Sequence, residues 1–125
     1  MCLISDCLFE NHKEPFKTYT KKYPLPKLMF VSEYTGMQHV NRHVDREAVF
    51  GSVIVAMSDS GEQLTMWPGG NEDSSRGLGS ARNCTQTRGL NKARNTVVFL
   101  SGIPHEQSKP KRSRKKPRYI LVMWY

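Results

Sequence analysis

The chain holds few of the large apolar residues that build a protein core, and this limits what it can fold into. Only 27 of its 125 residues are Val, Ile, Leu or Phe. That share, about 22%, lies just above the roughly 20% below which highly charged chains tend to be disordered. We therefore expect one small domain with a thin core, partly disordered, and a chain that folds only on a partner is the alternative.

The apolar pattern predicts an α+β fold, in which one helix packs on a small antiparallel sheet with long disordered or loop segments outside. Residues 36–50 give the helix signal, because apolar residues recur there at helical spacing. These residues are Met37, Val40, Val44 and Ala48. Thr35 and Gln38 stand at capping-box spacing before them, and Gly51 follows as a helix C-terminus often requires.

Short apolar runs predict the strands of the sheet. Residues 52–67 have the pattern of a β-hairpin around a Ser-Asp-Ser-Gly turn. Residues 28–34, 95–100 and 119–125 are rich in β-branched and aromatic residues and are predicted to be strands. Residues 11–27 contain three prolines and are predicted to be an extended loop.

Composition divides the chain into three parts. Residues 1–67 form the N-terminal part of a single small domain, with the helix at about 36–50 and the hairpin at about 52–67. Residues 68–95 are a glycine-rich basic loop or linker, because they lack apolar periodicity. Residues 96–125 contain a strand, the basic tract at 109–118 and a C-terminal strand.

Positive charge is concentrated in the second half of the chain. Residues 1–66 carry seven Lys or Arg and eight Asp or Glu, a net charge of −1. Residues 67–125 carry twelve and three, a net charge of +9. An asymmetry of this kind is typical of proteins that contact a polyanion.

The basic tract at residues 109–118 contains seven Lys or Arg among ten residues, and Pro110 and Pro117 favour an extended backbone. Guanidinium groups bind phosphate through two hydrogen bonds, and ammonium groups act as point charges. The predicted polyanion-binding residues are Lys109, Lys111, Arg112, Arg114, Lys115, Lys116 and Arg118 in the tract, and Arg76, Arg82, Arg88, Lys92 and Arg94 in the glycine-rich loop.

These features predict a small, basic, non-enzymatic accessory protein that binds nucleic acid, or that is targeted to the nucleus through the tract. RNA is preferred over DNA, because no helix has a pattern that reads the major groove. An acidic protein is a second possible partner, and membrane contact is a minor alternative. Three cysteines set up no disulfide framework, which favours an intracellular location, nuclear in a eukaryote.

Two other functions stay open. A small toxin-like ribonuclease would use His39 or His43 for acid–base catalysis near Arg42 and Arg46. A lineage-specific interaction protein would use the tract to bind an acidic partner. His39, His43 and Glu47 share a stripe of the predicted helix, but an ordinary solvent-facing surface explains them. We therefore expect no catalytic residue, metal or cofactor, and favour a non-enzyme without excluding an enzyme.

Overall fold

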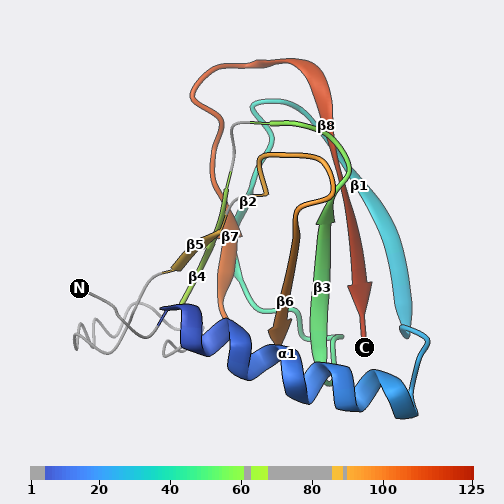
Figure 1. Ribbon diagram of the computed structural model, residues 1–125. Helices are drawn as coiled ribbons and strands as arrows, with labels where there is room; N and C mark the ends of the chain where they lie inside the picture. The colour runs from blue at the N-terminus through green and yellow to red at the C-terminus, as the bar shows by residue number, and fades with distance from the viewer. Residues whose placement is uncertain (1–4, 61–62, 68–85, 89) are drawn as a thin grey trace.

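The computed structural model describes residues 5–60, 63–67, 86–88 and 90–125. Within these ranges one helix and two four-stranded sheets form the fold (Figure 1). The first sheet contains, in spatial order, β1 (Leu28–Gly36), β8 (Arg114–Trp124), β3 (Gly51–Ala56) and β6 (Thr96–Leu100). The second contains β2 (Val40–His43), β7 (His105–Gln107), β4 (Leu64–Met66) and β5 (Gln86–Arg88).

All strand pairs are antiparallel, and successive strands change sheet at every connection except the one between β4 and β5. Two sheets linked in this way form a jelly-roll, the arrangement found in cupins. The predicted α+β fold is therefore wrong: the described residues form two antiparallel four-stranded sheets and one helix, and not a helix packed on one small sheet.

The core lies between the two sheets, where inward-facing residues of both meet. Its buried cluster includes Ile54 and Ile120 from the first sheet and Leu64 and Met66 from the second. Phe99 from β6 is 1% exposed. Alternate residues of each strand point inward, so a jelly-roll builds this core from few large apolar residues.

The predicted helix at 36–50 is wrong, and the bonds at its supposed start show why. The side-chain oxygen of Gln38 does accept the backbone N–H of Thr35, at 2.9 Å, as a capping box would suggest. The backbone N–H of Gln38 also donates to the carbonyl of Thr35, at 3.0 Å. These bonds close a turn at Gly36, whose φ is +55°, and the chain then enters β2.

The predicted hairpin at 52–67 is also wrong, because its two strands lie in different sheets. β3 pairs with β6 and β8, whereas β4 pairs with β5 and β7. The strands predicted at 28–34, 95–100 and 119–125 are confirmed as β1, β6 and β8. Residues 68–85 and 89, which the predicted glycine-rich loop includes, lie outside the described residues.

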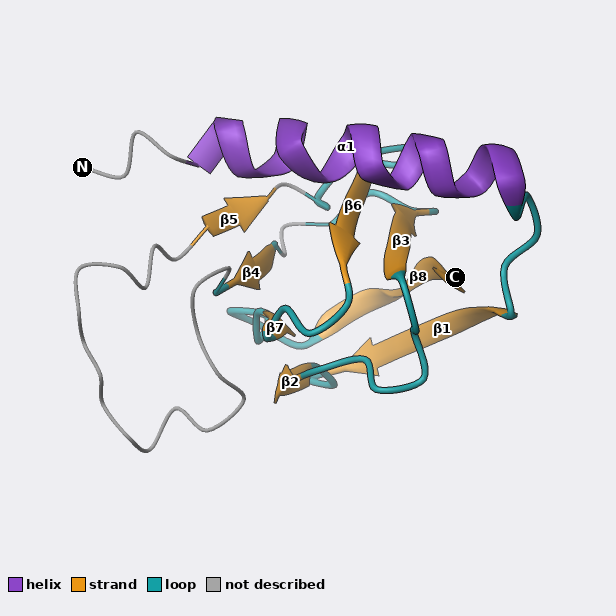
Figure 2. Ribbon diagram, turned by 90° about the horizontal axis from the view of Figure 1, so that it is seen from below, coloured by secondary structure: helices purple, strands orange, loops and turns teal. Residues whose placement is uncertain are grey.

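The helix α1 (Ser5–Lys22) includes residues 11–22, which were predicted to belong to an extended loop, and it contains Pro15. It lies across one end of the strands (Figure 2). Phe16 is 5% exposed and contacts the rings of Phe50 and Tyr125 edge-on, at 5.6 and 5.1 Å between centroids. Aromatic packing thus stabilises a helix that its proline content argues against. No helix within the described ranges has the length and apolar character of a membrane span.

Gly51 is a point at which α1 and the first sheet approach closely. A Cβ atom there would lie 2.5 Å from Cε2 of Phe16 and 2.5 Å from the carbonyl oxygen of Phe99. Both distances are far below a normal contact, so glycine at this position is needed to let the helix pack.

We expect Gly51→Ala to destabilise the protein by about 2–3 kcal/mol, the upper part of the cost typical of overpacking, because one of the two clashes is with backbone. Gly102→Ala is the control, because a Cβ there meets nothing within 4 Å and only its φ of +83° is strained. Its cost should be about 1 kcal/mol. Urea unfolding of both variants measures the difference, and an equal or smaller loss for Gly51→Ala would contradict the packing described.

Candidate metal centre

Pairing between β2 and β7 brings two histidines together. His43 ends β2 and His105 begins β7, and they are direct partners in the antiparallel register. Their ring centroids are 4.3 Å apart. Asp45 follows His43 by two residues, and its Oδ1 lies 3.2 Å from Nε2 of His43 and 3.5 Å from Nε2 of His105. Three possible metal ligands therefore converge at one point.

Backbone carbonyls fix which ring nitrogen of each histidine faces that point. Nδ1 of His43 lies 2.8 Å from the carbonyl oxygen of Asn41, and Nδ1 of His105 lies 2.9 Å from that of Ile103. A carbonyl only accepts hydrogen bonds, so each Nδ1 carries the proton. Each Nε2 faces Asp45, and a metal ion bound at this point would take the place of its contact with the carboxylate. Metal-binding histidines are normally held in this way by an outer hydrogen bond.

The carboxylate of Asp45 is held as firmly as the rings. Its Oδ2 accepts a 2.8 Å hydrogen bond from Oγ of Ser52, a residue that is fully buried in β3. Burial by itself raises the pKa of Asp45, but hydrogen bonds from His105, His43 and Ser52 outweigh it and hold that pKa well below its usual range. The group is therefore a carboxylate anion, the form in which Asp binds a metal ion.

A cavity of about 190 Å³ lies beside the three residues, between the sheets. Its polar lining consists of Ser32, Tyr34, His43, Asp45, His105 and Gln107. Its apolar lining consists of Phe30, Val40, Ile54, Ile120, Val122 and Trp124. Asp45 and His105 are buried, whereas the side chain of His43 is 38% exposed. Solvent thus reaches the centre from the side of His43.

Arg118 is a buried cation behind one wall of the cavity. It is 1% exposed and donates to Oε1 of Gln107 at 2.9 Å and to the carbonyl oxygen of Leu90 at 3.3 Å. The amide of Gln107 in turn donates to the hydroxyl of Tyr34, at 3.4 Å. Burial raises the pKa of Tyr34, so its hydroxyl stays protonated and neutral. The three side chains form one polar chain that ends on the cavity.

Trp124, which also lines the cavity, carries a donor without a partner. Its Nε1 is buried and makes no hydrogen bond to any residue that the structure describes. Buried donors without a partner are rare, and one that lines a cavity is available to an oxygen-bearing ligand there.

The donor set fits a divalent metal ion. The ligand atoms of His43, Asp45 and His105 all lie within 4.8 Å of one another. Two histidines and one carboxylate that leave coordination positions open form the facial triad of non-haem Fe(II) oxygenases. A catalytic zinc site also uses three protein ligands, so zinc is the alternative metal for this donor set.

The stripe of His39, His43 and Glu47 expected on a helix does not exist, because that helix is absent. Nδ1 and Nε2 of His39 are occupied by the carbonyl of Met37 and the side chain of Asn41, at 3.2 and 3.1 Å. Glu47 is exposed beyond β2. Of the three, only His43 belongs to the cluster, and the proposed ribonuclease centre at His39 and His43 is wrong.

The predicted polyanion-binding residues are not equivalent in the structure. Five of the tract are exposed: Lys109, Lys111, Arg112, Lys115 and Lys116. Arg114 donates to the carbonyls of Gly36 and Gln38, at 3.1 and 2.6 Å, and Arg118 is buried. Lys92 and Arg94 lie in the loop before β6. Arg88 lies in β5, and Arg76 and Arg82 are outside the described residues.

Sequence reasoning missed Asp45 and His105 because it treated residues 36–50 as helical. At a spacing of two residues, His43 and Asp45 point to the same side of an extended chain. This spacing, together with His105 after the strand predicted at 95–100, was the sequence signal that could have indicated the cluster. Arg118 was classed with the exposed cations, although it alternates with Ile120, Val122 and Trp124 along β8, on the face toward the core.

No protein-family model and no curated protein matches the sequence. Among solved structures, the chain is similar to a Pseudomonas putida prolyl-4-hydroxylase, with a TM-score of 0.60 and 21% identity over 90% of this chain and 61% of that one. It is also similar to Drosophila melanogaster CENP-C bound to CAL1, with a TM-score of 0.52 and 5% identity over 79% of this chain and 65% of that one. The chain thus spans less than two thirds of the length of either structure.

These similarities establish the jelly-roll fold, which hosts an enzyme in one case and a protein-bound partner in the other. The chain places a His-Asp-His cluster in the interior of this fold. The prediction of a non-enzymatic, RNA-binding accessory protein is wrong, because the fold is shared with an enzyme and the interior holds a cluster of possible metal ligands. The predicted acidic partner and the nuclear location stay predictions.

We expect Ser52→Ala to destabilise the protein by about 1–3 kcal/mol, because it leaves a buried carboxylate oxygen of Asp45 without its donor. Ser101→Ala is the control, since the hydroxyl of Ser101 bonds the carbonyl of Val49 at the exposed surface. Its removal should cost less than about 0.5 kcal/mol. Denaturant unfolding compares the two variants, and equal losses would argue against a structural role for the bond to Asp45.

Proposed function

We propose that the protein is a non-haem Fe(II) oxygenase that hydroxylates a C–H bond of a polypeptide side chain. The observation that carries this proposal is the cluster of His43, Asp45 and His105 at the interior cavity of a jelly-roll. Its two-histidine, one-carboxylate composition favours Fe(II). The similarity in fold to a protein named a prolyl-4-hydroxylase supports hydroxylation as the reaction and a polypeptide as the substrate class.

The residues around the cluster have separate roles in this proposal. His43, Asp45 and His105 would bind the metal, and Ser52 and two backbone carbonyls would orient them. The apolar residues of the cavity would exclude water from the reacting C–H bond. Fe(II), if bound by these residues, would supply the site at which dioxygen is activated.

Hydroxylation places one atom of dioxygen in the product, so two electrons must reduce the other. A 2-oxo acid balances this reaction: C–H, O₂ and the 2-oxo acid give C–OH, CO₂ and a carboxylic acid shorter by one carbon. We propose a dicarboxylic 2-oxo acid, because the chain of Tyr34, Gln107 and Arg118 can hold a second carboxylate. Gln107 lies two residues beyond His105 in β7, about 7 Å along the strand.

Loss of a metal ligand should abolish iron binding. We expect Asp45→Ala and His105→Ala to weaken Fe(II) binding by more than about a hundredfold, beyond the 10–100-fold typical of outer-shell changes. His39→Ala should bind iron as the wild type does, because His39 lies outside the cluster. Anaerobic equilibrium dialysis with metal quantification measures all three. Equal loss in His39→Ala, or retention of zinc with no affinity for iron, would contradict the proposed centre.

Arg118 should select the dicarboxylic acid. We expect iron-dependent oxygen uptake to favour 2-oxoglutarate over 2-oxopentanoate, which lacks the second carboxylate, by about ten- to a hundredfold, as a charged hydrogen-bonded pair provides. Arg118→Met should remove this preference and leave the slow reaction with 2-oxopentanoate unchanged, which also shows that the variant folds. A preference that survives the substitution would remove Arg118 from the co-substrate site.

A further inference from the structure

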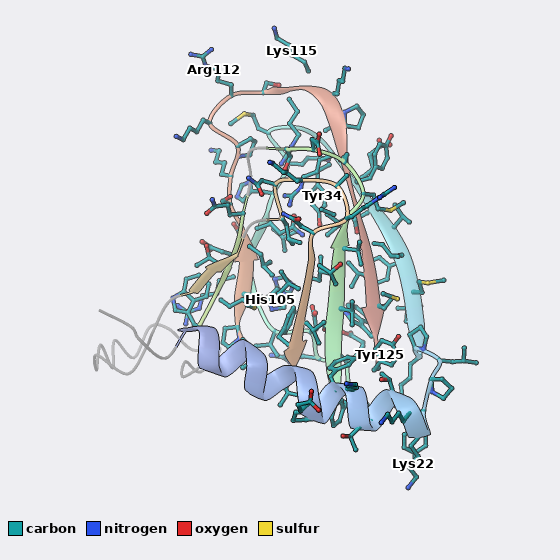
Figure 3. The ribbon with its side chains drawn as sticks, viewed as in Figure 1. Lys22, Tyr34, His105, Arg112, Lys115 and Tyr125 are labelled. Carbon is teal, nitrogen blue, oxygen red and sulfur yellow. The ribbon has the colours of Figure 1, made fainter. Side chains whose placement is uncertain are left out.

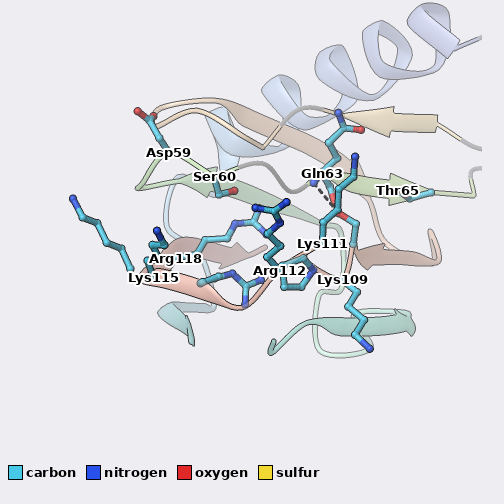
Figure 4. Close-up of a pocket in the computed structure, with 13 residues that line it drawn as sticks. Asp59, Ser60, Gln63, Thr65, Lys109, Lys111, Arg112, Lys115 and Arg118 are labelled. Carbon is cyan, nitrogen blue, oxygen red and sulfur yellow. Dashed lines mark hydrogen bonds between the residues drawn. The ribbon is translucent and has the colours of Figure 1, made fainter. Parts of the chain in front are cut away.

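The connection between β7 and β8 borders a second, larger cavity of about 930 Å³, here called the basic pocket (Figure 4). Exposed cations of the tract line it: Lys109, Lys111, Arg112, Lys115 and Lys116. Arg114 and Arg118 add two cations that are partly or fully buried. Asp59 is the one acidic residue among the described lining residues.

Hydrogen bonds hold the basic pocket in shape at both ends of the tract. At the start, Ser108 and Gln63 exchange bonds: the hydroxyl of Ser108 accepts the backbone N–H of Gln63 at 3.0 Å, and the N–H of Ser108 donates to the carbonyl of Gln63, also at 3.0 Å. At the other end, Arg114 is fixed to the carbonyls of Gly36 and Gln38. A surface that is already ordered loses less entropy when a ligand binds.

The positive charge of the basic pocket is not balanced by its own carboxylate. Oδ1 of Asp59 accepts the backbone N–H of Ala93 at 2.8 Å, so this carboxylate anchors a loop. Cations held close together repel one another and destabilise the fold, and such a cluster raises the local concentration of anions. The remaining polar lining residues, Ser60 and Thr65, can only add neutral hydrogen bonds.

The arrangement of the cations favours an extended ligand over a small anion. Lys109 and Lys115 point away from each other at the two ends of the basic pocket (Figure 4). Arg112 and Lys115 project from the end of the molecule opposite Lys22 (Figure 3). A ligand that neutralises the whole set must therefore carry several negative charges along a chain.

The basic pocket adjoins the metal centre through one hydrogen-bonded pair. Gln107 lines the metal cavity, Arg118 lines the basic pocket, and the two side chains are bonded at 2.9 Å. His105 lies on the strand that leads into the tract. A ligand bound at the tract would therefore contact the connection between β7 and β8, and β7 also supplies the metal ligand His105.

We propose that the basic pocket binds an acidic segment of the polypeptide substrate, rich in Asp or Glu. This inference rests on the proposed function, because only the proposed function makes the ligand a substrate. It adds that the substrate carries an acidic segment. Long, flexible lysine and arginine side chains can pair with carboxylates along a polypeptide in several registers. The site therefore selects acidic character and not one fixed sequence.

The test is the binding of a fluorescein-labelled peptide rich in Glu and Asp, followed by fluorescence anisotropy at low and high salt. The wild type should bind it, with weaker binding at high salt because exposed charges are screened. The same peptide with Gln and Asn in place of the acids should not bind. Replacing Lys111, Arg112, Lys115 and Lys116 with alanine should weaken binding of the acidic peptide about tenfold or more.

The matched control replaces Lys17, Lys21, Lys22 and Lys27, which are exposed near or on α1, with alanine. It removes the same charge from a different surface and should bind the peptide nearly as well as the wild type. Equal loss in both variants, no peptide binding by the wild type, or tighter binding of a single-stranded RNA of equal charge would each overturn the proposal.

The peptide assay is run without metal, and iron binding of the pocket variant is measured separately. Retained iron binding with lost peptide binding supports the pocket as a separate substrate site. Failure of the peptide assay with intact iron binding overturns the pocket alone and leaves the metal centre in place.

Discussion

The antiparallel pairing of β2 with β7 is the interaction on which the candidate site depends. It sets His43 directly opposite His105, so two rings that are 62 residues apart in the sequence meet within a few ångströms. A shift of one residue in this register would turn one ring out of the interior. The protonated Nδ1 of each ring then leaves Nε2 to face Asp45. Strand register and backbone hydrogen bonds together determine the geometry of the cluster.

β8 connects this centre to the rest of the molecule. Its inward-facing residues run from Arg118 through Ile120 and Val122 to Trp124, and so contribute a buried cation, core packing and an indole that lines the cavity. The same strand begins in the basic tract and pairs with both β1 and β3. The cations of the tract therefore have different places in the fold. Arg114 bonds backbone carbonyls, Arg118 is buried, and the others are exposed.

Part of the fold followed from the sequence. The apolar runs that became β1, β6 and β8 were predicted correctly, because continuous β-branched and aromatic stretches have few other stable uses. The prediction of a helix at 36–50 was wrong because a turn closed by Thr35 and Gln38 has the same residue spacing as a capping box. The helix α1 was not predicted because Pro15 disfavours a helix locally. The contacts that stabilise it come from Phe50 and Tyr125, which are distant in the sequence.

The candidate site was harder to predict from the sequence than the fold. His43 and His105 come together only through strand pairing, which local periodicity does not reveal, and His43 was read with its helical neighbours instead of with Asp45. The tract was recognised as a basic surface, but its charge could not show that Arg118 is buried beside Gln107. Long-range strand pairing, and not residue type, determines which of these residues lie in the interior and which lie on the surface.

The most direct test of the metal centre is a crystal structure of the protein loaded with Fe(II) under anaerobic conditions, with anomalous scattering recorded at the iron absorption edge. The structure should show one iron peak in the interior, coordinated by Nε2 of His43, Nε2 of His105 and a carboxylate oxygen of Asp45, with coordination positions open toward the cavity. An interior without iron, or iron bound by other residues, would contradict the account.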